Sequence, residues 1–175
     1  MSEIFLRLLD LESRILNASR PVEAAFLAVD LAHTLIPYRQ AVLWSRTGGV
    51  VALSGAATIE DGSPYVLWLG QVFRALESLD TPTAITAADL PAVQAEQWVD
   101  WLPAHAVALP MAGEVLLYAR DDSFGDQEIA LLHHLATLVK VSRLALLPRS
   151  GLSIRLKALG ARKTRMIAAR MIAAA

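Results

Sequence analysis

The sequence predicts a single α+β domain built around antiparallel hairpins. Its 175 residues match the length of one ordinary domain. Helix-like apolar spacing alternates along the chain with short strand-like runs that meet at glycine turns. Apolar residues make up 55% of the chain and charged residues 19%, which is enough apolar material for a packed core. The expected order of elements is ααββαβαββα, within residues 1–148.

The first forty residues predict two helices, separated at residues 17–21. A capping residue followed by Pro21 suits the start of the second helix. The second helix is expected to bury one face, and His33 falls on that face. We therefore expect His33 to pack there with one ring nitrogen hydrogen-bonded. The expected face consists of Val22, Phe26, Val29, His33 and Ile36.

The middle of the chain predicts two hairpins and two further helices. The first hairpin joins strands 40–45 and 50–53 through Gly48 and Gly49. The second joins strands 106–110 and 114–119 through Ala112 and Gly113. Between the hairpins we expect a helix over 66–76, a short strand over 83–86 and a short helix over 92–101.

The last helix, 126–147, has a clear start and two apolar stripes. Gly125 can cap it, with Glu128 placed as in a capping box, and Pro148 ends it. A sheet cannot cover both stripes, so we expect a homodimer through the terminal helices. The interface is expected at Leu131, Leu135 and Leu138, with the first helix supplying the complementary surface.

Composition excludes several kinds of chemistry. The chain has no cysteine, which removes disulfides, thiolate metal sites and thioether-linked chromophores. The adjacent His133 and His134 point about 100° apart on a helix and cannot chelate one ion from one face. No nucleophile, base and acid stand at a catalytic spacing. We therefore expect no catalytic residues, no metal, no cofactor and no enzymatic activity.

Three segments resemble a GAF domain, a small sensory module related to the PAS fold. They are the helix-to-strand passage 72–89, the hairpin from Ala108 to Tyr118, and the start of the last helix at Phe124-Gly125-Asp126. The resemblance covers residues 5–147 and implies an antiparallel sheet with helices packed on its faces. The missing cysteines separate the chain from bilin-binding GAF domains and from GAF-type methionine sulfoxide reductases. The Asn-Lys-Phe-Asp-type signature of cyclic-nucleotide-binding members is also absent, which argues against cyclic GMP.

A cluster of aromatic residues marks the expected ligand pocket. The candidates are Tyr65, Trp68, Trp98, Trp101 and His105. Indole and phenol rings can line a small-molecule pocket, and they can equally fill it. The second alternative describes a degenerate domain that only dimerises.

Charge is strongly divided along the chain. Residues 1–148 hold all 17 acidic and nine basic residues, a net charge of −8, whereas 149–175 hold seven basic residues and no acid. This basic segment precedes an apolar run at 171–175, which we expect to continue as a membrane helix. The expected membrane-proximal residues are Arg155, Lys157, Arg162, Lys163 and Arg165.

The basic segment resembles the stretch before the first membrane helix of haemolysin-D-like membrane fusion proteins. Some of these bacterial export adaptors carry a GAF-like domain in front of that helix. The resemblance implies a cytoplasmic sensory or interaction module held near an anionic membrane surface. Nucleic acid is a poor partner, because the domain's −8 would repel phosphate. The alternative is the regulatory domain of a soluble signalling or transcription regulator.

Overall fold

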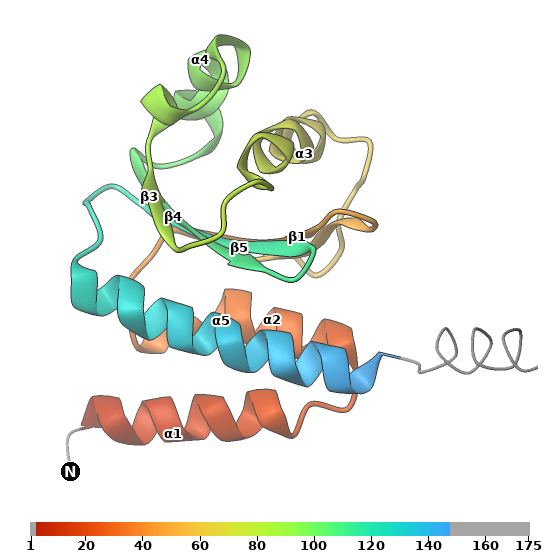
Figure 1. The fold of residues 1–175 in the computed structure, drawn as a ribbon, viewed down its shortest axis with the longest axis vertical. Coiled ribbons are helices and arrows are strands. Elements are labelled where there is room, and N and C mark those ends of the chain that lie inside the picture. The colour runs from red at the N-terminus through yellow and green to blue at the C-terminus, as the bar shows by residue number, and fades with distance from the viewer. Residues whose placement is uncertain (1–2, 148–175) are drawn as a thin grey trace, which may run out of the picture.

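The computed structural model describes residues 3–147, which form five α-helices, two short 3-10 helices and one five-stranded sheet (Figure 1). The first half contains α1 (Glu3–Leu16), α2 (Pro21–Leu31), η1 (Ala32–Thr34), β1 (Gln40–Ser45), β2 (Gly49–Leu53) and α3 (Pro64–Leu76). The second half contains β3 (Thr83–Ile85), η2 (Ala87–Asp89), α4 (Ala92–Trp101), β4 (His105–Met111), β5 (Glu114–Arg120) and α5 (Asp126–Leu146). This confirms the α+β class and the expected order of the main elements.

The sheet is antiparallel throughout, in the order β2-β1-β5-β4-β3. Both expected hairpins are present, and Gly49 and Gly113 take positive φ angles of 70° and 77° at their turns. The long-range pair is β1 with β5, in which Gln40 lies opposite Ala119. This pairing brings the start of β1 and the end of β5 together at one end of the sheet.

Helices cover both faces of the sheet (Figure 1). α3 and α4 lie on one face, α2 and α5 lie on the other, and α1 packs on the outer side of α2 and α5. Strand residues alternate between the two cores, as the pleat requires. In β5, Leu116 and Tyr118 face α2 and α5, whereas Val115 and Leu117 belong to the core under α3 and α4.

The expected buried face of α2 is wrong at two of its five positions. His33 is exposed, and Val22 is 37% exposed. The α-helix ends at Leu31 and continues as a 3-10 turn, which changes the angular spacing and swings His33 away from the core. One ring nitrogen does have the expected hydrogen-bond partner, because the imidazole Nδ1 lies 2.5 Å from the Asp30 carbonyl oxygen. The buried face of α2 is formed by small residues: Ala24, Ala25, Ala28 and Val29.

Buried polar groups fix the C-terminal half of α5. Ser142 donates its hydroxyl to the Ile15 carbonyl at 2.8 Å, which joins α5 to α1. Arg143 donates to both carboxylate oxygens of Glu114, at 2.9 and 2.5 Å, and to the Pro21 carbonyl at 2.6 Å. By length and composition α5 could span a membrane. In this structure it is a core helix, because Leu132, Leu135, Ala136 and Val139 are buried in the domain.

Candidate ligand cleft at the end of α4

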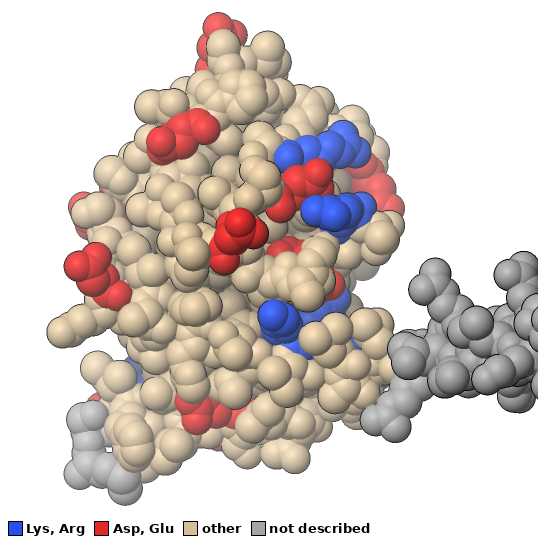
Figure 2. Space-filling view, in the orientation of Figure 1, with Lys and Arg blue, Asp and Glu red and all other residues tan. Residues whose placement is uncertain are grey.

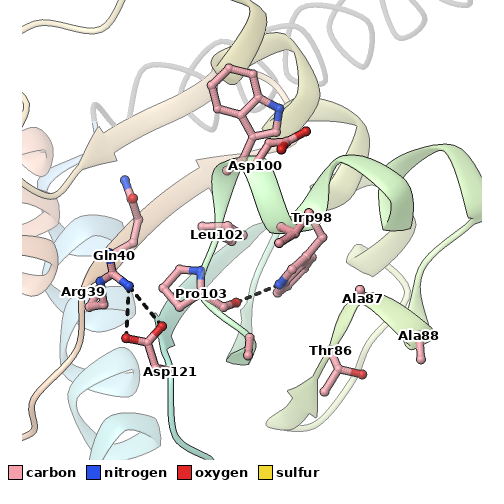
Figure 3. Close-up of a pocket in the computed structure, with 13 residues that line it drawn as sticks. Arg39, Gln40, Thr86, Ala87, Ala88, Trp98, Asp100, Leu102, Pro103 and Asp121 are labelled. Atoms are coloured by element: carbon pink, nitrogen blue, oxygen red, sulfur yellow. Dashed lines mark hydrogen bonds and ion pairs between the residues drawn. The ribbon is translucent and has the colours of Figure 1, made fainter.

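A cleft of about 730 Å³ opens where α4 ends, beside the start of β1 and the end of β5 (Figure 3). This volume is in the range of small-molecule pockets. Arg39 and Asp121 stand on one side and Thr86, Ala87 and Ala88 on the other (Figure 3). The residues 98–104, together with Gln40, complete the lining.

The sequence at the end of α4 explains the shape of this wall. Leu102 leaves the helix in an extended conformation, with φ −129° and ψ 152°. Pro103 then prevents the helix from continuing, because proline has no N–H to donate. The Trp98 indole Nε1 donates to the Pro103 carbonyl at 2.7 Å, which folds the segment back against α4. The wall is therefore fixed by a local hydrogen bond.

Arg39 and Asp121 form an exposed ion pair at the opposite wall. Arg39 directly precedes β1, and Asp121 directly follows β5, so the pairing of these strands brings the two side chains together. Arg39 Nη1 donates to both carboxylate oxygens of Asp121, each at 3.0 Å. Since both side chains are more than 60% exposed, the pair contributes little to stability and is accessible to a ligand.

The aromatic candidates do lie together, but most of them fill space. The Tyr65 ring stacks on Trp101 at 5.2 Å and on Trp68 at 6.4 Å, and Trp68 meets Trp98 edge to face at 6.2 Å. Trp68 and Trp98 are almost completely buried, and the indole N–H of each donates a hydrogen bond to a backbone carbonyl. Of the five predicted ligand residues, Trp98 and Trp101 line the cleft; Tyr65, Trp68 and His105 do not.

Tyr65 carries an unusual buried hydroxyl. Its oxygen is inaccessible and has no hydrogen-bond partner among the described residues. Burial raises the pKa of Tyr65 well above its ordinary value of 10.0. The phenol is therefore neutral near pH 7, and its stacked ring is packed into the α3 and α4 side of the domain.

Large side chains also fill the core between the sheet and α3. The Trp44 ring stacks almost parallel on Phe73, with 5.7 Å between centroids and 3° between planes. Leu69 and Val72 of α3 are completely buried beside them. The cleft at the end of α4 instead lies at one end of the sheet, beside residues 98–104, and its lining includes no residue of α3.

The histidines do not assemble a metal site in the part of the chain that the structure describes. Residues 3–147 contain no group of three or more His, Asp or Glu side chains that could hold an ion. His133 and His134 are exposed, and His134 Nε2 lies 2.5 Å from Glu12 Oε1 on α1. His105 begins β4, opposite Arg120.

The expected dimer residues are only partly available to a partner. Leu135 is 1% exposed, because it belongs to the core that α1 and α2 share with α5. Its assignment to an interface between two copies is therefore wrong for this conformation, because helices of the same chain already cover Leu135. Leu131 and Leu138 are half-buried. The membrane-proximal candidates Arg155, Lys157, Arg162, Lys163 and Arg165 lie outside the described residues.

Comparisons with known proteins identify the fold. No protein-family model matches the sequence, and no curated protein sequence matches it. Among solved structures, the GAF domain described as that of a sensor histidine kinase from Pseudomonas syringae pv. tomato has a TM-score of 0.52 and 16% identity, covering 91% of this chain and 92% of that one. Residues 122 to 287 of a methyl-accepting chemotaxis protein match with a TM-score of 0.61 and 15% identity, covering 83% of this chain and 98% of that one. The GAF domain of cyanobacteriochrome TePixJ matches with a TM-score of 0.55 and 15% identity, covering 75% of this chain and 94% of that one.

These likenesses establish a GAF fold. The five-stranded antiparallel sheet between two layers of helices is the arrangement shared with domains that are themselves called GAF domains. At identities of 11–18% the comparisons establish the fold alone.

Proposed function

We propose that this chain is a non-enzymatic sensory and interaction module on the cytoplasmic side of a membrane-anchored export adaptor of the haemolysin-D-like class. The observation that carries the proposal is the junction after α5. The core helix ends at Leu146, and the sequence continues within three residues into the basic segment 149–175. A folded acidic domain is thus joined directly to a segment of opposite charge.

The sensory part of the proposal draws on the proteins that share the fold. Their names describe a methyl-accepting chemotaxis protein, a sensor histidine kinase and a cyanobacteriochrome, and these names support a sensory role. The open cleft at the end of α4 gives this chain a place for an input molecule. Because the chain has no cysteine, a thioether-linked input molecule is excluded, and we expect the input molecule to bind non-covalently.

The membrane part of the proposal draws on electrostatics. Figure 2 shows acidic side chains spread over the visible face of the domain, with basic residues in a few places. Each basic residue near an anionic leaflet gains about 1 kcal/mol, within a Debye length of about 8 Å at physiological salt. The seven basic residues of 149–175 would be attracted to such a surface while the domain, with its charge of −8, is repelled. The module would then face the cytosol.

Co-sedimentation with vesicles tests this membrane role. Full-length protein should bind phosphatidylglycerol vesicles at low salt, bind less at high salt, and not bind phosphatidylcholine vesicles. Replacing the five residues Arg155, Lys157, Arg162, Lys163 and Arg165 by glutamine should abolish binding and leave the thermal unfolding of the domain unchanged. Equal binding by this variant, or no binding by the native chain at low salt, would exclude the membrane-proximal role and favour a soluble regulator.

A further inference from the structure

Basic side chains are concentrated at the end of the sheet that holds both hairpin turns. Ser45, the last residue of β1, pairs with Glu114, the first residue of β5. Beyond this pair, the Arg46 N–H donates to the Gly113 carbonyl at 2.9 Å, which joins the two turns. α5 ends beside them, since Arg143 in its last turn donates to Glu114 at 2.9 Å. We call this region the hairpin-turn end. The basic residues that line its two hollows are Arg46, Arg74, Lys140 and Arg143.

The charge of the hairpin-turn end differs from that of the rest of the domain. Its acidic residues are Asp61 and Glu114, which line the same hollows, and Glu77, which pairs with Arg46. Four basic and three acidic residues give this end a net charge of +1, whereas the rest of residues 1–148 holds five basic and 14 acidic residues, a net charge of −9. Figure 2 shows most of the visible basic side chains on the side of the domain where α5 ends (Figure 1).

The opposite end of the sheet is acidic. Two of its carboxylates directly follow β5, two stand in the first turn of α5, and one lines the cleft at the end of α4: they are Asp121, Asp122, Asp126, Glu128 and Asp100. At about 3.4 Å per residue, the seven residues of β5 separate the two ends by about 20 Å. This separation exceeds twice the Debye length of about 8 Å at physiological salt. A charged surface at one end therefore acts mainly on the charges of that end.

Three of the basic side chains at the hairpin-turn end are accessible to such a surface. Arg46 and Arg74 are exposed and Lys140 is half-buried, whereas Arg143 is buried in its ion pair. Within residues 3–147, neither Arg74 nor Lys140 forms an ion pair. The pair that Arg46 forms is exposed and therefore weak. All three cations are thus available to anionic groups outside the domain.

The chain holds this end close to the basic segment. Leu146 is the last residue of α5, and Arg149, the first basic residue of 149–175, follows three residues later. Three residues span at most about 10 Å even when fully extended. The exposed turn residues 47–49 and 112–113 are small and uncharged, so a flat surface can approach the basic side chains beside them. A surface that attracts the start of the basic segment therefore meets this end of the domain first.

We propose that the hairpin-turn end is the surface of the domain that contacts an anionic phospholipid bilayer, with Arg46, Arg74 and Lys140 toward the lipid headgroups. The bilayer attracts this end and repels the acidic remainder, which fixes the orientation of the domain. The cleft at the end of α4 lies at the other end of the sheet, so it opens toward the cytosol and its input molecules. This inference rests on the membrane part of the proposed function and adds the contact surface and the orientation to it.

Matched variants of the full chain test the contact surface. Co-sedimentation with phosphatidylglycerol vesicles is measured in about 0.1 M salt, where the Debye length is about 10 Å. Arg74→Gln and Lys140→Gln should each weaken binding at least about threefold, because each removes a cation that lies near the headgroups. Arg7→Gln is the matched control: it removes the same charge, but Arg7 bonds to the Thr34 carbonyl at the other end of the domain. Its binding should equal that of the native chain, and all variants should keep the native unfolding temperature.

A second measurement reports the orientation directly. Because the chain has no cysteine, Ala112→Cys and Ser123→Cys each create a single site for a fluorescent label. Both residues are exposed; Ala112 lies in the second hairpin turn, and Ser123 lies in the loop after β5, at the opposite end of the sheet. On vesicles that also contain a lipid with a nitroxide headgroup, the label at residue 112 should be quenched more strongly than the label at residue 123.

Two results would overturn the inference: binding by Arg74→Gln and Lys140→Gln that equals binding by Arg7→Gln, and equal quenching of the two labels. If the glutamine variant of the basic segment still loses binding, the membrane role of that segment stands and only the contact surface on the domain is wrong. A native chain that does not bind these vesicles even at low salt would exclude the membrane role and the contact surface together.

Discussion

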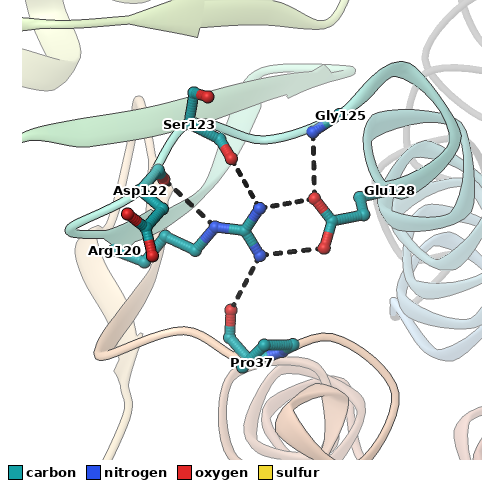
Figure 4. Close-up of polar contacts among 6 residues, drawn as sticks. All are labelled: Pro37, Arg120, Asp122, Ser123, Gly125 and Glu128. Atoms are coloured by element: carbon teal, nitrogen blue, oxygen red, sulfur yellow. Dashed lines mark hydrogen bonds and ion pairs between the residues drawn. The ribbon is translucent and has the colours of Figure 1, made fainter.

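Arg120 and Glu128 form a doubly hydrogen-bonded ion pair that joins the end of β5 to the first turn of α5 (Figure 4). Arg120 Nη1 and Nη2 donate to the two carboxylate oxygens at 2.9 and 2.5 Å. The remaining donors go to the carbonyls of Asp122, Ser123 and Pro37. The guanidinium also lies 4.1 Å from the centroid of the Phe124 ring. One side chain, only 14% exposed, thus ties two backbone segments, the loop after β5 and the segment at Pro37, to α5.

Replacing Arg120 should therefore destabilise the domain. Arg120→Gln removes the charged hydrogen bonds and leaves three carbonyls without their donor, so we expect a loss of about 2 kcal/mol in the free energy of unfolding. Urea denaturation monitored by circular dichroism measures this loss. Arg39→Gln is the matched control, because its exposed pair with Asp121 should contribute less than about 1 kcal/mol. Equal losses in the two variants would contradict the anchoring role of Arg120.

The same pair predicts a pH dependence of stability. The hydrogen bonds from Arg120 lower the pKa of Glu128 below its ordinary value of 4.5, and the Gly125 N–H adds to this effect while burial opposes it. A carboxyl group with a lowered pKa in the folded state stabilises the fold above its unfolded pKa, and this stabilisation is lost as the pH falls through the folded pKa. The difference in unfolding free energy between native protein and Glu128→Gln should thus be larger at about pH 7 than at about pH 3.

Urea titrations of both proteins at the two pH values measure this difference. Glu77→Gln serves as the control, because the pair of Glu77 with Arg46 is exposed and should contribute little at either pH. A difference for Glu128→Gln that stays constant with pH would show that its carboxylate charge does not stabilise the fold.

The buried hydroxyls of Tyr65 and Tyr118 predict that replacement by phenylalanine has opposite effects on stability at the two positions. Its oxygen is inaccessible and unpartnered among the described residues, so Tyr65→Phe should raise the free energy of unfolding by about 1 kcal/mol. Tyr118 is equally aromatic and completely buried, but its hydroxyl donates to the Ala28 carbonyl at 2.8 Å. Tyr118→Phe should therefore lower the free energy of unfolding by about 1 kcal/mol. Thermal and urea unfolding should separate the two variants, and a loss in both would mean that the Tyr65 hydroxyl has a bonding partner in solution.

Local signals in the sequence predicted the elements of the fold well. The expected role of Glu128 at the start of α5 is confirmed, because the Gly125 N–H donates to Glu128 Oε2 at 2.9 Å. The two hairpins and α4 also begin and end near the expected residues, because glycine turns and apolar spacing act within a few residues of the chain. Such features require no knowledge of distant contacts.

Features that depend on distant pairing were not predicted. Arg39 and Asp121 meet only because β1 pairs with β5, and no spacing in the sequence reports that register. In the sequence, Arg143 resembles an ordinary basic residue in the last turn of a helix. In the structure it is buried and hydrogen-bonded to Glu114 and to the Pro21 carbonyl. Leu135 was assigned to a partner chain because periodicity alone cannot show that α1 covers it. Contacts between segments that lie about a hundred residues apart in the sequence can be identified only from the folded structure.

Leu135 is buried, but the terminal helices expose other apolar side chains, and we expect a homodimer to form through these. Leu9 and Leu16 of α1 are 44% and 53% exposed, and Val141 and Leu144 of α5 are 53% and 52% exposed. The Ser142 bond to the Ile15 carbonyl shows that the ends of α1 and α5 lie together, so Leu16 and Leu144 belong to neighbouring turns. Exposed apolar side chains on neighbouring helices are typical of a protein interface.

Light scattering at tens of micromolar protein measures this association. The native chain should be a dimer, and Leu16→Glu combined with Leu144→Glu should be a folded monomer, because two charges would be buried without partners at the interface. Val99→Glu is the control, since Val99 is 82% exposed on α4 and lies on the opposite side of the sheet. Circular dichroism must show that all three proteins are folded, which is why the buried Leu135 is left unchanged. A native chain that is already monomeric, or a double variant that remains dimeric, would exclude these helices as the site of association.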